Sequence, residues 1–195
     1  MVQRVYSFGR KLIARWRAQP VAPTVTVDPR VQTIIIRSTA LGIPKRFFVY
    51  TPPGFKRTTS SLPALYLFRG HEREWVNPRE DGSRQGRTVI DVYEELLTAG
   101  AVGPMLLVFP GISSDDNTLP GLLVNFKQPP SQPAPGIGNG QFEDYFLRDL
   151  LPYVERHFRT SSSARSVDGF SLGGFMATKI AAQYPDRFAS VGAYD

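Results

Sequence analysis

The sequence predicts an α/β fold, in which a mostly parallel sheet carries helices on both faces. From residue 62 onward, short apolar runs typical of buried strands alternate with helical segments. A hairpin rich in β-branched residues precedes this alternation, and a glycine-rich corner with a central serine follows a short strand near the end. The chain has 195 residues and is 42% hydrophobic, which is enough for one domain with its own core.

The elements are expected in the following order. The first half is predicted to contain a hairpin from VQTIIIRST (31–39) and RFFVYTPPGF (46–55), a strand over 62–68, a polar loop over 68–86, a helix over 88–100 and a strand over 105–111. The second half is predicted to contain a long connection over 110–140, a helix over 141–158 with a break or kink at Pro152, a short strand over 164–168, a helix ended by Pro185 and a last strand over 189–194.

Charge is unevenly distributed along the chain. Residues 1–50 hold nine Lys or Arg and one acid, whereas the remainder holds 14 basic and 16 acidic residues. The basic excess therefore belongs to the N-terminal segment, and nucleic-acid binding is not predicted. We expect two parts, namely a basic arm and linker over 1–30 and a domain over 31–195.

The first 18 residues have the pattern of a basic amphipathic helix. Val5, Phe8, Leu12 and Trp16 recur at helical spacing. An arm docked through this apolar stripe is the favoured interpretation, and contact with a membrane surface is the alternative. Arginines interrupt every apolar run and no stretch has membrane-spanning length, so we predict no secretory signal and a cytoplasmic location.

The segment GFSLG matches the pattern G-x-S-x-G of a nucleophile corner. Ser171 must adopt a strained turn for its hydroxyl to project from the sheet, and side chains at Gly169 and Gly173 would collide with the neighbouring strand and helix. The helix that begins near Gly173 directs its first N–H groups at the site, so the Leu172 N–H is one candidate oxyanion donor. The strand before and the helix after favour a nucleophile over a structural turn.

With these features the chain resembles the esterase family of α/β-hydrolases that includes enterochelin esterases, feruloyl esterases, S-formylglutathione hydrolases and mycobacterial mycolyltransferases. The resemblance runs from about residue 31 to the end and is carried by RFFVYTPPGF, LPALYLFRGHEREW, QFEDYFLRDLLPYVERHF and RSVDGFSLGGFMATKIAAQYPDRFASVGAYD. It implies the α/β-hydrolase fold and a serine carboxylesterase that forms an acyl-enzyme from a small-molecule ester. It also places the second oxyanion donor at the backbone N–H of His71.

A serine of this kind needs a histidine base and a carboxylate, which in this fold follow the serine in the chain. None of the residues after Ser171 is a histidine, and the chain has only two histidines. We expect His71 to line the pocket or brace its loop, and His157 to be solvated near a helix end. The absence of cysteine and the scarcity of histidine predict no metal site, and no dinucleotide or phosphate-binding motif predicts a cofactor.

The carboxylates near the corner have separate expected roles. Asp195 ends the last strand, on the edge where active-site loops emerge, and is a candidate acid, although the resembling family places its acid one strand later. Asp168 is expected to pair with an arginine such as Arg165. Asp115 and Asp116 are interpreted as loop solvation and turn chemistry.

The resemblance also implies an eight-stranded sheet of which this chain would contain the first six strands, so the expected fold is C-terminally incomplete. The alternative to an esterase is thus a catalytically incompetent hydrolase-fold fragment or an interaction module without the triad histidine. Peptidase and acyltransferase variants stay open. The last strand would form an exposed apolar edge, which predicts self-association. The segment 118–140 is a candidate pocket wall, and Trp75 either lines the cleft or anchors its loop.

Overall fold

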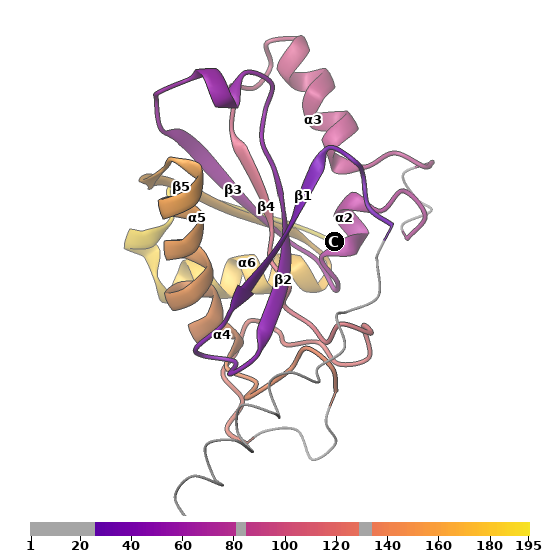
Figure 1. Ribbon diagram of the computed structural model, residues 1–195, viewed down its shortest axis with the longest axis vertical. Coiled ribbons are helices and arrows are strands. Elements are labelled where there is room, and N and C mark those ends of the chain that lie inside the picture. The colour runs from indigo at the N-terminus through magenta and orange to yellow at the C-terminus, as the bar shows by residue number, and fades with distance from the viewer. Residues whose placement is uncertain (1–25, 81–84, 129–133) are drawn as a thin grey trace, which may run out of the picture.

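The computed structural model describes residues 26–80, 85–128 and 134–195 (Figure 1). The amphipathic pattern over 1–18 lies outside these residues. The strands are β1 (Val31–Arg37), β2 (Pro44–Tyr50), β3 (Leu62–Phe68), β4 (Leu106–Phe109), β5 (Thr160–Phe170) and β6 (Ser190–Tyr194). The helices are η1 (Phe55–Arg57), α2 (Arg73–Val76), α3 (Val89–Thr98), α4 (Phe142–Asp144), η3 (Tyr145–Leu150), α5 (Leu151–Phe158), α6 (Leu172–Gln183) and η4 (Pro185–Arg187).

The strands form one sheet in the order β1-β2-β4-β3-β5-β6. The β1–β2 hairpin and the β2–β4 pair are antiparallel, whereas β4, β3, β5 and β6 are parallel to one another. Parallel neighbours require crossover connections, and the helical segments between these strands supply them. This arrangement confirms the predicted α/β class with a mostly parallel sheet.

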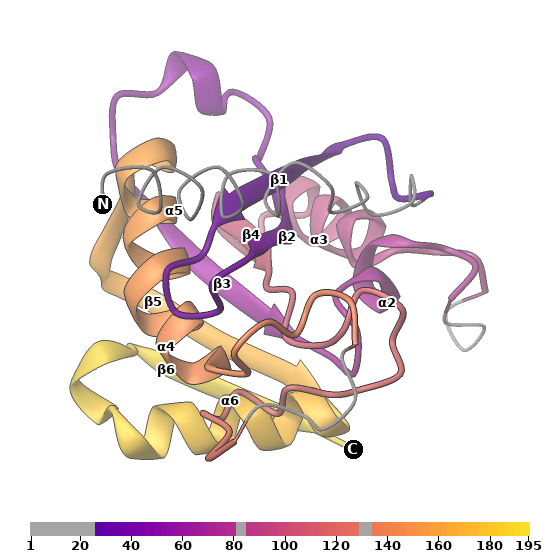
Figure 2. The same ribbon diagram turned by 60° about the horizontal axis from the view of Figure 1, so that its bottom comes forward.

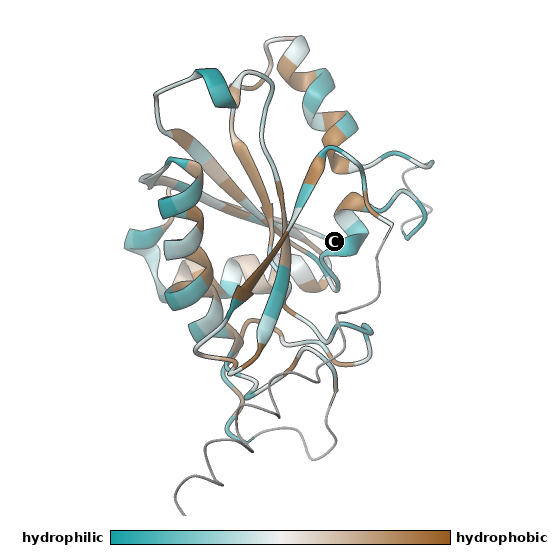
Figure 3. Cartoon of the chain, viewed as in Figure 1, coloured by the Kyte–Doolittle hydropathy of each residue, from teal (hydrophilic) through white to brown (hydrophobic). Residues whose placement is uncertain are grey.

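Helices cover both faces of the sheet, as the alternation along β3 requires. Ala64, Tyr66 and Phe68 face one core with α5 and α6, whereas Leu65 and Leu67 face the other core with α2 and α3. Figure 3 shows the hydrophobic residues gathered on the central strands and hydrophilic ones on much of α5. Burial on two faces explains why β3 reads as a nearly continuous apolar run.

Two helical features differ from the expectation. The polar loop after β3 contains the short helix α2, which four residues are too few to reveal by periodicity. The predicted helix over 141–158 is confirmed in position, but its middle turn is a π-helix, η3, before α5 begins with Pro152 in its first turn. The backbone stays helical from Leu150 into α5, so the chain is not broken at this proline, and the structure shows only a change from π to α hydrogen bonding just before it.

The connection after β4 packs against the body of the domain. Figure 2 shows it passing between α2 and α6. Leu123 is fully buried, and a Cβ on Gly121 would lie 2.6 Å from the Phe142 ring. The candidate pocket wall is thus anchored in the core around Gly121 and Leu123, and the Lys179 Nζ of α6 donates to the Leu123 carbonyl at 2.9 Å.

β6 is the outermost strand beside β5. Val191 and Tyr194 are 50% and 60% exposed, which matches the apolar edge expected from the sequence. Self-association through this edge stays a prediction. None of the helices among the described residues is both long and apolar enough to span a membrane.

Candidate active site

Ser171 lies at the point where β5 ends and α6 begins. Its backbone has φ 55° and ψ −123°, a combination that residues other than glycine rarely adopt. The Ser171 N–H donates to the Tyr194 carbonyl oxygen at 2.7 Å, which ties the corner to β6. The serine is exposed. The predicted strained turn is therefore present, at the carboxyl edge of the parallel strands.

Two glycines allow the chain to turn this sharply. A Cβ at Gly173 would lie 2.0 Å from the Phe68 carbonyl oxygen, and a Cβ at Gly169 would lie 2.2 Å from the Gly173 carbonyl carbon. Any side chain at either position would collide with backbone that cannot move aside. The spacing of glycine around the serine thus has the steric origin that the sequence pattern suggests.

The first turn of α6 lies beside the serine. Leu172 occupies the first helical position, so its N–H has no partner in a preceding turn of the helix. The positive end of the helix dipole lies at the same place. This geometry suits a donor to an anion that develops next to Ser171.

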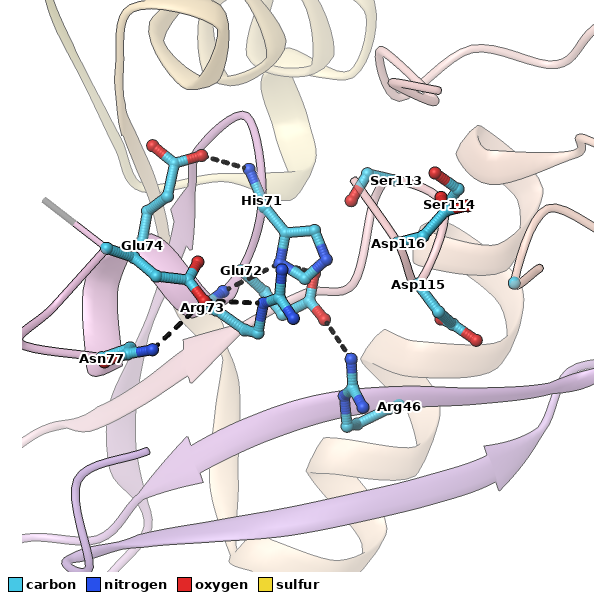
Figure 4. Close-up of polar contacts among 12 residues, drawn as sticks. Arg46, His71, Glu72, Arg73, Glu74, Asn77, Ser113, Ser114, Asp115 and Asp116 are labelled. Carbon is cyan, nitrogen blue, oxygen red and sulfur yellow. Dashed lines mark hydrogen bonds and ion pairs between the residues drawn. The ribbon is translucent and has the colours of Figure 1, made fainter. Parts of the chain in front are cut away.

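The loop after β3 lies against the same corner. Phe68 ends β3 and pairs with Gly169 of β5, two residues before Ser171. His71 follows Phe68 by three residues, so its loop begins beside the serine corner. The His71 N–H, the predicted second donor, points to the Glu74 carboxylate and donates to its Oε1 at 2.6 Å (Figure 4). The sequence did not indicate that the Glu74 carboxylate would accept the His71 N–H.

The His71 imidazole is buried, with 1% of the residue exposed. Its Nδ1 accepts the Arg73 N–H at 3.2 Å and lies 3.2 Å from the Glu72 Oε2. Burial, and then the positive charge of nearby cations, lowers the pKa of His71 to about 3. The Arg73 and Glu72 contacts belong to its own loop, which supports the bracing role over that of a general base.

His157 lies at the opposite end of the sheet. It is in the last turn of α5, just before β5, whereas the serine follows β5, and the part of β5 that runs alongside Leu62–Phe68 of β3 alone spans about 20 Å. The exposed ring stacks on Tyr153 with a centroid distance of 3.9 Å. The expectation of a solvated histidine near a helix end is confirmed, and the fold does not bring His157 to Ser171.

Asp195 lies beside the corner. It follows Tyr194, whose carbonyl oxygen accepts the Ser171 N–H, and it is exposed. Its position at the carboxyl end of β6 agrees with the edge on which we expected it. Its role as the triad acid stays a prediction.

The predicted ion pair between Asp168 and Arg165 is wrong. Arg165 pairs instead with Glu155 of α5. Residues three apart in a strand point to opposite faces, so Asp168 lies on the other side of the sheet. There it lines an apolar hollow beside α3, and burial raises its pKa.

Trp75 belongs to the same hollow, which has a volume of about 370 Å³ and is also lined by Leu67 and Val92. The ring packs against the core on the α3 face, and the Arg69 guanidinium lies 5.4 Å from its centroid. Of the two expected roles, the structure thus supports the one in which Trp75 anchors its loop.

Buried charges beside the His71 loop were not expected from the sequence. Lys45 and Glu72 are 1% and 2% exposed, and Arg46 Nη2 lies 3.3 Å from Glu72 Oε1 (Figure 4). Burial raises the pKa of Glu72. These contacts join β2 to the loops around the serine corner. The sequence does contain a signal for this cluster, namely the adjacent Lys45 and Arg46 within an otherwise apolar strand, because buried charges need buried partners.

The two aspartates of the connection after β4 have different roles. Asp115 Oδ1 lies 3.2 Å from the buried Lys45 Nζ, so the expectation of simple loop solvation is wrong for this residue. Asp116 accepts the Thr118 N–H at 3.1 Å and the Thr118 hydroxyl at 2.8 Å, which confirms turn chemistry there.

The chemistry available at the corner is nucleophilic. The site offers a hydroxyl and backbone N–H donors, and over residues 26–80, 85–128 and 134–195 no three His, Cys, Asp or Glu side chains are grouped to hold a metal ion. This arrangement can attack a carbonyl carbon and bind the oxyanion that results.

Strain at the serine leads to a prediction about stability. We expect Ser171→Gly to raise the free energy of unfolding by about 1 kcal/mol, because glycine adopts this backbone conformation without strain. Urea denaturation measures the change. Ser163→Gly is the matched control, since this exposed serine lies within β5, where glycine should lower stability by about 0.5–1 kcal/mol. A loss of stability in Ser171→Gly would contradict the strain.

Comparison with known proteins gives concordant matches. The family model Esterase, with the description "Putative esterase", matches residues 38–194. Over 170 residues the chain is 31% identical to Esterase Rv1288 of Mycobacterium tuberculosis, a match covering 86% of this chain and 32% of that protein. It is 25% identical over 164 residues to S-formylglutathione hydrolase of Paracoccus denitrificans, a match covering 81% of this chain and 54% of that protein.

Solved structures share the fold. A ferulic acid esterase superposes with a TM-score of 0.64 at 24% identity, covering 85% of this chain and 59% of that one. The enterobactin esterase FES from Shigella flexneri gives a TM-score of 0.59 at 21% identity, covering 89% and 40%. These likenesses establish the α/β-hydrolase fold. The chain spans about a third of the length of the first curated relatives.

Proposed function

The chain belongs to the esterase family, and on this premise we propose that it carries the nucleophile of a serine carboxylesterase acting on a small-molecule ester. The observation that supports this role most directly is the backbone of Ser171. Ser171 has a strained backbone, lies between two glycines that sterics require and begins a helix. This combination is typical of a serine that presents its hydroxyl as a nucleophile.

The proposed reaction has two halves. The Ser171 Oγ attacks the ester carbonyl carbon, and its proton passes through a base to the leaving alcohol. The carbonyl electrons move to the oxygen, which the Leu172 and His71 N–H groups bind as an oxyanion. When the carbonyl re-forms, the alcohol leaves and an acyl-enzyme remains. Water then attacks the acyl group, releasing the carboxylic acid and the free serine.

The base in this proposal is neither histidine of the chain. His71 is buried within its own loop, and His157 lies at the far end of β5. A histidine from outside these 195 residues therefore completes the mechanism, and Asp195 is the candidate acid beside it. The proposal names the substrate only as a small-molecule ester, because the described residues do not distinguish one ester from another.

A fluorophosphonate probe tests the nucleophile. The probe phosphonylates an activated serine, so in a protein that also supplies the histidine base we expect labelling that Ser171→Ala abolishes, since the reacting atom is gone. Ser163→Ala serves as the matched control, because Ser163 is an exposed serine at the start of β5 and should leave labelling unchanged. Mass spectrometry of the labelled peptide identifies the modified residue.

The positions of the histidines favour one alternative, a catalytically incompetent hydrolase-fold fragment or interaction module. In that case the probe would not label Ser171 even when the histidine base is supplied, and Ser171→Ala would change nothing. Strong labelling that depends on Ser171 excludes this alternative. Labelling of another residue, or equal labelling of Ser171→Ala, contradicts the esterase proposal.

A further inference from the structure

Glu74 holds the backbone donor that the proposed reaction assigns to the oxyanion. Its Oε1 accepts the His71 N–H at 2.6 Å (Figure 4). A charge-assisted bond of this length is among the stronger hydrogen bonds in proteins. As long as it persists, an ester carbonyl oxygen cannot receive that N–H.

The position of Glu74 is set by its own loop. It lies in α2, three residues after His71, and its Oε2 accepts the Arg69 Nε–H at 2.9 Å. A Cβ on Gly70 would lie 3.0 Å from the Glu74 Oε1, so the glycine gives the carboxylate room to approach. The Glu74 side chain is 23% exposed, which leaves it access to solvent on one side.

This carboxylate lies close to the serine corner. The Arg69 guanidinium that binds it also lies 4.3 Å from the ring centroid of Phe170, the residue before Ser171. A Cβ at Gly173 would lie 2.8 Å from the Arg69 backbone nitrogen, so the first turn of α6 borders the same loop. The negative charge of Glu74 therefore lies where the reaction would build a second negative charge.

We propose that Glu74 is an internal competitor for the oxyanion site, which closes the His71 donor in the resting protein and must leave it when an ester binds. The inference rests on the proposed function of the Ser171 corner. Two like charges repel each other when they share one donor, so binding of the oxyanion requires the carboxylate to turn away. The Arg69 Nε–H, which already binds the Glu74 Oε2, can keep the carboxylate paired after its Oε1 has left the His71 N–H.

The first test observes the donor itself. In the ¹H–¹⁵N spectrum the His71 amide proton should lie downfield, because it is bound to a carboxylate, and Glu74→Ala should move it upfield by about 1 ppm or more. Glu80→Gln is the matched control, since Glu80 pairs with Arg73 near the same loop and does not accept the His71 N–H. An unchanged His71 amide in Glu74→Ala overturns the proposal.

The second test measures competition with a tetrahedral anion. Phenylboronic acid forms a bond from boron to the Ser171 Oγ, the hydroxyl proton leaves to water, and the anionic adduct places an oxygen at the oxyanion donors. We expect Glu74→Ala to bind the boronate about tenfold more tightly, with Glu74→Gln in between and Glu80→Gln unchanged. Boron NMR distinguishes the tetrahedral adduct.

A role in bracing the loop would give the opposite sign. If Glu74 served only to hold the loop in shape, Glu74→Ala would bind the boronate more weakly, and this result overturns the proposal. If no protein forms an adduct at Ser171, the proposed function fails, and the inference that rests on it fails as well. An adduct of equal strength in wild type and Glu74→Ala overturns the competition alone.

Discussion

Replacing Phe146 with alanine is expected to lower the free energy of unfolding by about 3–5 kcal/mol, the largest loss we predict for a single side chain. Phe146 is fully buried in η3, and its ring meets Tyr66 at 5.5 Å and Phe68 at 5.2 Å, both edge-on. Alanine would leave a cavity against β3 and remove the aromatic contacts. Urea denaturation followed by fluorescence and circular dichroism measures the change.

Phe175→Ala is the matched control for this prediction. Phe175 lies in α6 and is 55% exposed, so its truncation should change stability by less than about 1 kcal/mol. Comparable losses in the two variants would show that the core does not depend on η3 as the packing implies. Because Phe68 ends the strand that leads to the His71 loop, Phe146→Ala should also loosen the oxyanion side of the site.

Gly173→Ala is expected to lower the free energy of unfolding by about 3 kcal/mol or more and to remove probe labelling together with the fold of the corner. The added Cβ would lie 2.0 Å from the Phe68 carbonyl oxygen and 2.3 Å from its carbonyl carbon. Both atoms belong to a central strand, so the strain must be relieved by moving α6 away from β3. Thermal and urea denaturation measure the loss of stability.

Gly103→Ala is the control for the glycine, because no heavy atom lies within 4 Å of a Cβ built there. It should change stability by no more than about 0.5–1 kcal/mol in either direction. A Gly173→Ala protein as stable as the wild type would contradict the close contact between α6 and β3. The steric account of the nucleophile corner would then be wrong as well.

Local patterns were sufficient for much of the fold. The hairpin, the two-faced strand β3 and the serine corner each depend on residues adjacent in sequence, so periodicity and turn chemistry reveal them. The capping box at Thr88 and Asp91, which starts α3, is another local signal. The failed pairing of Asp168 with Arg165 was also decidable from the sequence, because the alternation of a strand separates residues three apart.

Other features depend on residues that the sequence keeps far apart. Lys45 lies 70 positions before Asp115, and Arg46 lies 26 positions before Glu72, so no local pattern pairs them. These charges are buried where Lys45 and Arg46 of β2 contact the loop of Glu72 and the connection that contains Asp115. The π-helical turn η3 likewise has no signal in helix propensity.

The sequence by itself determined the class of fold, the order of the elements and the identity of the serine corner, because each of these depends on short-range sterics and periodic burial. Only the tertiary structure decided the state of the site around that corner. It placed His157 at the far end of β5, buried the His71 ring and set the Glu74 carboxylate on the His71 N–H. The position of a side chain beside a donor depends on how separate elements pack, and that packing becomes determined only when the whole sheet is assembled.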